Sequence, residues 1–74
     1  MKKIDGKISV IMPAHNEAAM IKENVLLTIE TLRTFETDFE IILIDDGSDD
    51  DTWLKISELA QDFSNIKATR NMQN

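Results

Sequence analysis

The fold is decided by one stretch, Glu40-Ile41-Ile42-Leu43-Ile44-Asp45, which runs directly into Asp46-Gly47-Ser48. Four consecutive branched aliphatic residues are typical of a strand that is buried on both faces, as strands of a parallel sheet are. The Asp-Gly pair ends the strand, because both residues favour turns. This stretch therefore predicts an α/β fold built around a buried parallel strand.

A second strand is predicted nearer the N-terminus, over residues 8–12. It reads Ile8-Ser9-Val10-Ile11-Met12 and is ended by Pro13. The segment between the two strands, residues 17–34, has helical spacing, with apolar side chains at Ile21, Val25, Ile29 and Leu32. Asn16 is the predicted N-cap of this helix, and Glu17 lies in its first turn, where an acid suits the helix dipole.

A second helix is predicted after Gly47. Ser48 and Asp51 have the spacing of a capping box, with Asp in place of the usual Glu. The apolar stripe of this helix consists of Ile56, Leu59, Ala60 and Phe63. A third, weaker strand is predicted over residues 66–70.

The element order is therefore β-α-β-α-β. Helical crossovers make the strands parallel, and two right-handed crossovers place both helices on one face of a three-stranded sheet. The other face then carries apolar side chains that a complete doubly wound domain would cover. We expect residues 1–74 to be the truncated N-terminal part of a larger domain, and to self-associate through the bare face or a sheet edge.

Composition narrows the function classes. The chain has 74 residues, no cysteine and a net charge of −6, and ten of its 14 acidic residues lie between Glu36 and Asp62. This acidity argues against nucleic-acid binding, which needs Lys and Arg. No apolar run approaches the ~20 residues of a spanning helix, and the N-terminus does not have the pattern of a signal peptide. We therefore expect a cytoplasmic protein.

Two polar loops follow the predicted strands. In open α/β sheets, ligands bind beyond the carboxyl ends of the strands, and adjacent parallel strands would place residues 13–17 beside residues 45–48. A carboxylate after the second strand can accept hydrogen bonds from the N–H groups of a base, such as uracil N3–H or the guanine edge, or it can hold a cation. His15 can stack on a base or hydrogen-bond to it.

Simpler roles for the same residues stay open at this point. The carboxylates of Asp45 and Asp46 can cap a turn and the following helix, and His15 can be a solvated loop residue. Glu17 can serve the helix dipole alone. Trp53, in the first turn of the second helix, is expected to be a packing residue.

The two loops together resemble family 2 glycosyltransferases. Residues 8–17, with Pro13-Ala14-His15-Asn16-Glu17, are similar to the family's opening strand and its Pro-(Tyr or His)-Asn-Glu pattern. Residues 40–48 are similar to its second strand and Asp-Asp-Gly-Ser turn. Residues 70–74 resemble the point where the family carries an Asn-x-Gly turn, with either Asn71 or Asn74 as the Asn and with the Gly absent from this stretch. One departure is Asp51, where many members have Gly.

The resemblance implies the Rossmann-like, nucleotide-binding half of a GT-A domain. It assigns the wall of the nucleotide pocket to Pro13, Ala14 and His15, and a nucleotide or helix-start role to Glu17. It makes Asp46 the carboxylate that reads the base and Asp45 its support. The donor would be a UDP- or GDP-sugar, and the acceptor would be a saccharide or a lipid-linked compound. With a lipid-linked acceptor, the parent enzyme would act at the cytoplasmic face of a membrane.

The resemblance also implies a divalent metal, Mg or Mn, held by a later Asp-x-Asp motif, and a still later catalytic base. The run Asp49-Asp50-Asp51 is not that motif, because it lies too early and at a helix start. Neither the later motif nor the base occurs in residues 1–74, so we assign no metal ligand and no catalytic residue here, and we expect this chain alone to be inactive.

Two other function classes stay open. A receiver-like phospho-acceptor domain also gathers acids at strand ends, but such domains place the acidic pair after the first strand. A non-catalytic assembly module would use the bare sheet face.

Overall fold

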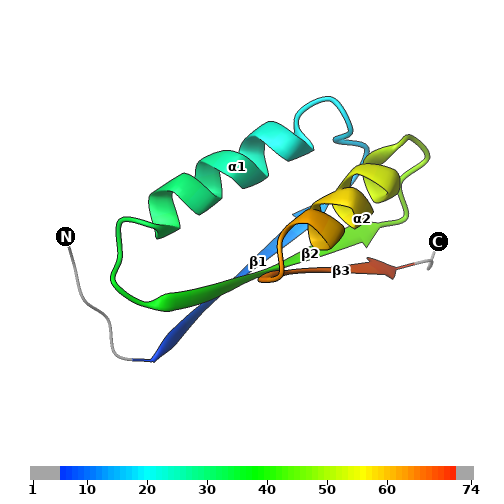
Figure 1. Ribbon diagram of the computed structural model, residues 1–74. Coiled ribbons are helices and arrows are strands. Elements are labelled where there is room, and N and C mark those ends of the chain that lie inside the picture. The colour runs from blue at the N-terminus through cyan, green and yellow to red at the C-terminus, as the bar shows by residue number, and fades with distance from the viewer. Residues whose placement is uncertain (1–5, 72–74) are drawn as a thin grey trace.

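The computed structural model describes residues 6–71 and confirms the predicted element order (Figure 1). The elements are β1 (Lys7–Ala14), α1 (Ile21–Leu32), β2 (Asp38–Asp46), α2 (Thr52–Asp62) and β3 (Ile66–Asn71). The strands form one sheet in the order β1-β2-β3, and both pairings are parallel. The fold is therefore the expected three-stranded α/β sheet with two crossover helices.

Both helices cover the same face of the sheet (Figure 1), as two right-handed crossovers require. The hydrophobic core lies between this face and the helices. Its buried members are Ala14, Ile21, Val25, Ile29, Leu32, Ile41, Leu43, Ile56, Leu59 and Ile66. Every second residue of β2 points into this layer, and the run ends with Asp45, which is wholly buried beside apolar neighbours.

The opposite face of the sheet is mixed rather than uniformly apolar, which corrects the sequence-based expectation. Its apolar part consists of Ile11, Ile42 and Ile44, of which Ile11 is 62% exposed. Its polar part, toward the start of the strands, consists of Ser9, Glu40, Lys7 and Lys67. The aliphatic run of residues 41–44 did not indicate this mixture, because the polar residues of the open face belong to β1, to β3 and to the first half of β2.

The sequence predicted that Pro13 ends the first strand, and this is wrong. Pro13 lies within β1, opposite Ile44 of β2. β1 is an edge strand, so the missing N–H of a proline can face away from the neighbouring strand.

The predicted start of the first helix is also wrong. α1 begins at Ile21 with Met20 as its N-cap, and Asn16 lies in the left-handed region with φ 51°. Glu17 is therefore in a turn before the helix, where its carbonyl accepts the N–H groups of Met20 and Ile21. The capping box of Ser48 and Asp51 is not formed either, because α2 starts at Thr52 and its N-cap makes no side-chain cap hydrogen bond.

Candidate functional site

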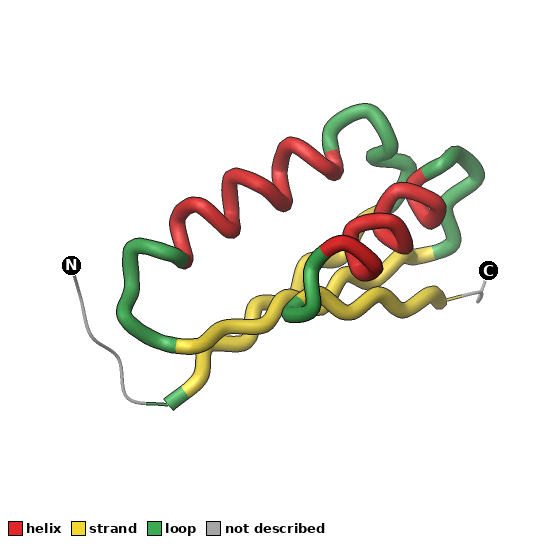
Figure 2. The backbone as a smooth tube through the Cα atoms, viewed as in Figure 1, coloured by secondary structure: helices red, strands yellow, loops and turns green. Residues whose placement is uncertain are grey.

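The two polar loops lie side by side at the carboxyl edge of the sheet, the edge where the strands end. Ala14 at the end of β1 pairs with Asp45 near the end of β2. The chain then turns away into the loop before α1 in one case and into the loop before α2 in the other, and both loops are at the same end of the molecule (Figure 2). This is the arrangement that parallel pairing predicts for residues 13–17 and 45–48.

Side chains of the second loop cap three consecutive backbone N–H groups of the first. The N–H of Asn16 donates to Ser48 Oγ at 2.8 Å. The N–H of Glu17 donates to Thr52 Oγ1 at 2.8 Å, and that of Ala18 to Asp50 Oδ2 at 3.2 Å. These N–H groups are the donors that would otherwise attract a phosphate before a helix, so here they are used inside the protein.

A bond in the other direction completes the connection. Asn16 Oδ1 accepts the backbone N–H of Asp49 at 2.8 Å. The left-handed backbone of Asn16 is tolerated by an asparagine and directs its side chain across the gap. We call residues 15–18 and 47–52 together the joined loops, because hydrogen bonds in both directions hold them as one unit.

His15 has an orientation that its partners define. Its Nδ1 lies 2.8 Å from the backbone oxygen of Asp46. A carbonyl only accepts, so we assign the ring proton to Nδ1, which leaves Nε2 as an acceptor facing the Asn16 side-chain amide at 3.4 Å. Both ring nitrogens thus have protein partners, and the exposed ring is available mainly through its faces, which suits stacking.

The two consecutive aspartates do different things because successive strand residues point to opposite faces. Asp45 is fully buried, and its carboxylate accepts the backbone N–H of Ser48 at 3.2 Å and Nε–H of Arg70 at 3.1 Å. Asp46 is exposed at the edge, and its Oδ1 accepts from the amide of Asn71 at 3.2 Å. Asp45 is therefore a structural carboxylate, whereas Asp46 is accessible to a ligand.

The other predicted site residues lie at the same edge in different settings. Pro13 is exposed and Ala14 is buried, both at the end of β1. Glu17 is exposed, and its backbone forms the turn before α1. The structure thus brings Pro13, Ala14, His15, Glu17, Asp45 and Asp46 to one edge.

Sequence reasoning missed the residues that hold this edge together, above all Arg70, Thr52 and Asp50. Thr52 is completely buried and donates its hydroxyl to Asp50. That hydrogen bond is the main cause of the lowered pKa of Asp50. One signal pointed to Arg70: a buried strand that ends in an aspartate needs a cationic or N–H partner on its neighbour.

The acidic loop does not have the geometry of a metal site. Among residues 6–71, no three His, Cys, Asp or Glu side chains are grouped so that they could hold a metal ion. The resemblance assigns Mg or Mn to a later Asp-x-Asp motif, and we assign no described residue to that metal. No helix within this described range is long and apolar enough to cross a membrane.

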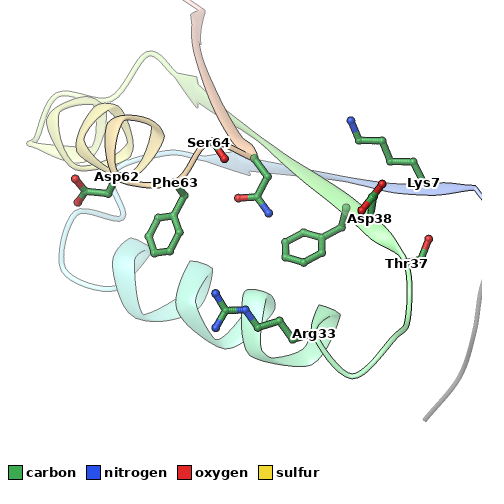
Figure 3. Close-up of a pocket in the computed structure, with 9 residues that line it drawn as sticks. Lys7, Arg33, Thr37, Asp38, Asp62, Phe63 and Ser64 are labelled. Atoms are coloured by element: carbon green, nitrogen blue, oxygen red, sulfur yellow. The ribbon is translucent and has the colours of Figure 1, made fainter.

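A cavity of about 580 Å³ opens at the other end of the sheet, near the start of the strands. Figure 3 shows it between the ends of both helices and the beginning of β2. It is lined by Lys7, Arg33, Thr37, Asp38, Phe39, Asp62, Phe63, Ser64 and Asn65. Its size is that of a ligand site, but it lies at the edge where open α/β sheets do not place theirs.

The three-stranded parallel sheet with two crossover helices puts the described residues in the class of open α/β folds. The family follows from comparison with known sequences: the chain belongs to glycosyl transferase family 2, whose model matches residues 9–74. The matched segment contains both loops of the edge.

Individual relatives agree with this assignment. Glycosyltransferase AglD of Haloferax volcanii is 40% identical over 63 residues, which cover 82% of this chain and 10% of that protein. The undecaprenyl-phosphate 4-deoxy-4-formamido-L-arabinose transferase of Proteus mirabilis is 35% identical, covering 74% of this chain and 17% of that enzyme. The enzyme of the same name from an Enterobacter species is 33% identical, with coverages of 84% and 20%. The chain thus spans a tenth to a fifth of the length of these relatives.

Proposed function

We propose that this chain forms the nucleoside-binding edge of an enzyme that transfers a sugar from a nucleotide-diphospho-sugar to an acceptor hydroxyl. One observation carries the proposal: the hydrogen bonds that join residues 15–18 to residues 47–52 next to the exposed Asp46. A preformed edge of this kind can hold a base without first having to order its loops.

Each candidate residue has a role that its contacts support. The free oxygen of Asp46 accepts an N–H of the base, as in uracil N3–H or the guanine edge, while Asn71 holds the other oxygen. The exposed ring of His15 stacks on the base, because both of its nitrogens are engaged within the protein. Pro13 and Ala14 line the same edge, and Glu17 shapes it through its backbone.

The diphosphate of the donor must be bound away from the joined loops. Three N–H groups before α1 are already capped by Ser48, Thr52 and Asp50, and the acids around them repel an anion. In the proposal, the Mg or Mn that neutralises a departing diphosphate belongs to the enzyme beyond the described residues. This chain binds and orients the nucleoside, and we expect it not to turn over alone.

The proposal extends to partners and location. The names of two relatives include undecaprenyl-phosphate, which supports a lipid-linked acceptor. A cytoplasmic enzyme acting at the cytoplasmic face of a membrane would have both substrates within reach.

For this chain alone, the 62% exposure of Ile11 beside Ile42 and Ile44 supports self-association through the open sheet face. The substitution I11K should lower the average molar mass measured by light scattering.

Titration calorimetry of the 74-residue chain with UDP and GDP tests the proposal, with ADP as the mismatched base. We expect binding of UDP or GDP that D46N weakens at least tenfold, since an amide nitrogen then faces the N–H of the base. D49N is the matched control, because the Asp49 contact to Asn16 is made by its backbone. Heat from neither UDP nor GDP would contradict the proposal, and equal losses in D46N and D49N would remove Asp46 from it.

A receiver-like function can be tested on the same 74-residue chain by its reaction with a phosphoryl donor. Such a domain would take up a phosphoryl group from acetyl phosphate in the presence of Mg²⁺, which mass spectrometry detects. We expect no modification.

A further inference from the structure

We propose that Arg70 is a positioning residue for nucleoside binding: it acts through the buried carboxylate of Asp45 to hold Asp46 in place. This inference rests on the proposed function of the carboxyl edge. Its starting point is the burial of Asp45, which has no exposed surface and yet carries a carboxylate. A buried charge needs a charged or hydrogen-bonded partner, and Arg70 Nε at 3.1 Å supplies both.

The register of the sheet extends this pair to Asp46. Asp45 lies opposite Arg70 and Asp46 lies opposite Asn71. The last two residues of β3 thus contact two consecutive carboxylates, one on the helix side of the sheet and one on the open side. The peptide between the two aspartates is held from both faces, just before the chain turns at Gly47 with φ 68°.

Arg70 has a second partner besides Asp45. Its guanidinium carbon lies 5.5 Å from the centre of the Trp53 ring, within the range of a cation–π contact. Trp53 belongs to the first turn of α2, directly after the joined loops. Arg70 therefore contacts both Trp53 of α2 and Asp45, the residue directly before Asp46.

Removing Arg70 alone would confuse loss of positioning with loss of stability, so the test compares two uncharged double variants. D45N/R70Q keeps a link of similar reach, because a glutamine amide and an arginine Nε are equally far from the backbone. D45V/R70M replaces the pair with apolar side chains and removes the link. K67M is the matched control, since Lys67 is a basic residue of β3 that is 72% exposed and contacts Glu40 at the other edge.

UDP titrations are carried out at a temperature at which circular dichroism shows every variant folded. We expect D45N/R70Q and K67M to bind within about threefold of the parent chain. We expect D45V/R70M to bind about tenfold or more weakly, the loss that follows when a group orienting a binding residue is removed.

Parent-like affinity in D45V/R70M would overturn the inference and leave the proposed function intact. Equal weakening of both double variants would overturn it as well, because charge rather than the link would then be responsible. Absence of UDP binding by the parent chain would overturn the proposed function and this inference together.

Discussion

The two edges of the sheet carry similar residues and differ in how those residues are held. At the carboxyl edge, Asp45 is buried against Arg70 at 3.1 Å. At the amino edge, where the strands begin, Glu40 of the same strand meets Lys7 at 3.6 Å and Lys67 at 3.7 Å, and both lysines are more than half exposed. The Asp45 carboxylate needs a fixed partner because it is fully desolvated, even though the Arg70 side chain is 34% exposed. The exposed lysines at the amino edge are screened by water.

The two edges also differ in the kind of candidate site that they offer. The amino edge has the cavity of about 580 Å³, and its lining mixes Lys7 and Arg33 with Asp38 and Asp62 (Figure 3). The carboxyl edge has hydrogen bonds that converge on two loops from both directions. Orientation of polar groups, rather than empty space, distinguishes the candidate site.

The largest effect on stability is expected from D45N. The new amide nitrogen must face either the Nε–H of Arg70 or the backbone N–H of Ser48, so two donors meet in a buried position and the cation loses its counter-charge. We expect a loss of about 3 kcal/mol in the free energy of unfolding, measured by urea denaturation. A loss below about 1 kcal/mol would mean that the Asp45 pair is no better held than an exposed one.

The second effect concerns the joined loops. Thr52 is completely buried, and its hydroxyl accepts the N–H of Glu17 while donating to Asp50. T52V keeps the shape of the side chain and leaves that N–H without its partner, so we expect a loss of about 2 kcal/mol. T69V, on the exposed side of β3, is the matched control and should change stability by less than about 0.5 kcal/mol.

The third effect separates backbone from side chain at Asn16. Both N16G and N16A lose the bond to the Asp49 N–H, but glycine tolerates a φ of 51° and alanine does not. We expect N16A to be less stable than N16G by about 1 kcal/mol. Equal stability of the two variants in parallel thermal melts would show that the left-handed turn is not required.

The smallest effect is expected from E40Q, the counterpart of D45N at the other edge. The lysines that contact Glu40 are more than half exposed, although the Glu40 side chain itself is only 19% exposed. Because water screens such pairs, the change in melting temperature at neutral pH should be under about 3 °C. A shift as large as that of D45N would erase the contrast between the two edges.

Acid should weaken both edges. The hydroxyl of Ser9 is the main cause of the lowered pKa of Glu40, and the hydroxyl of Thr52 is that of Asp50. A carboxyl group with a lowered pKa stabilises the fold above its unfolded pKa and loses this contribution as the pH falls through its folded pKa. Urea denaturation should therefore show stability falling below about pH 4, with a shallower slope in E40Q and in D50N.

Much of the fold could be predicted from the sequence, because strong local patterns agree with the topology. The aliphatic residues 41–44 must be shielded from water. The helical spacing of Ile21, Val25, Ile29 and Leu32 indicates a helix with an apolar face that packs on that strand. The predicted start of α1 was wrong because the groups that cap the preceding N–H donors come from across the fold. Asn16 resembles a local N-cap, yet the groups that satisfy the N–H donors of residues 16–18 are 32 to 35 residues away.

The candidate site was predicted in outline and not in its supports. Parallel pairing brings residues 13–15 next to Asp45 and Asp46, and the structure confirms that proximity. Glu17 contacts Thr52 instead. The role of Arg70 depends on the register between β2 and β3, which no local pattern specifies. Only the register shows that Arg70 lies opposite the buried Asp45, whereas Lys67 of the same strand lies opposite Ile42.

If the two loops act as one nucleoside-binding edge, a UDP titration followed by the amide chemical shifts of the isotopically labelled chain shows it most directly. We expect the amides of residues 15–18 and 46–52 to shift together with one dissociation constant, and the amides of Arg33, Asp38 and Phe63 around the amino-edge cavity to keep their shifts. Shifts confined to that cavity, or to one loop without the other, would contradict it.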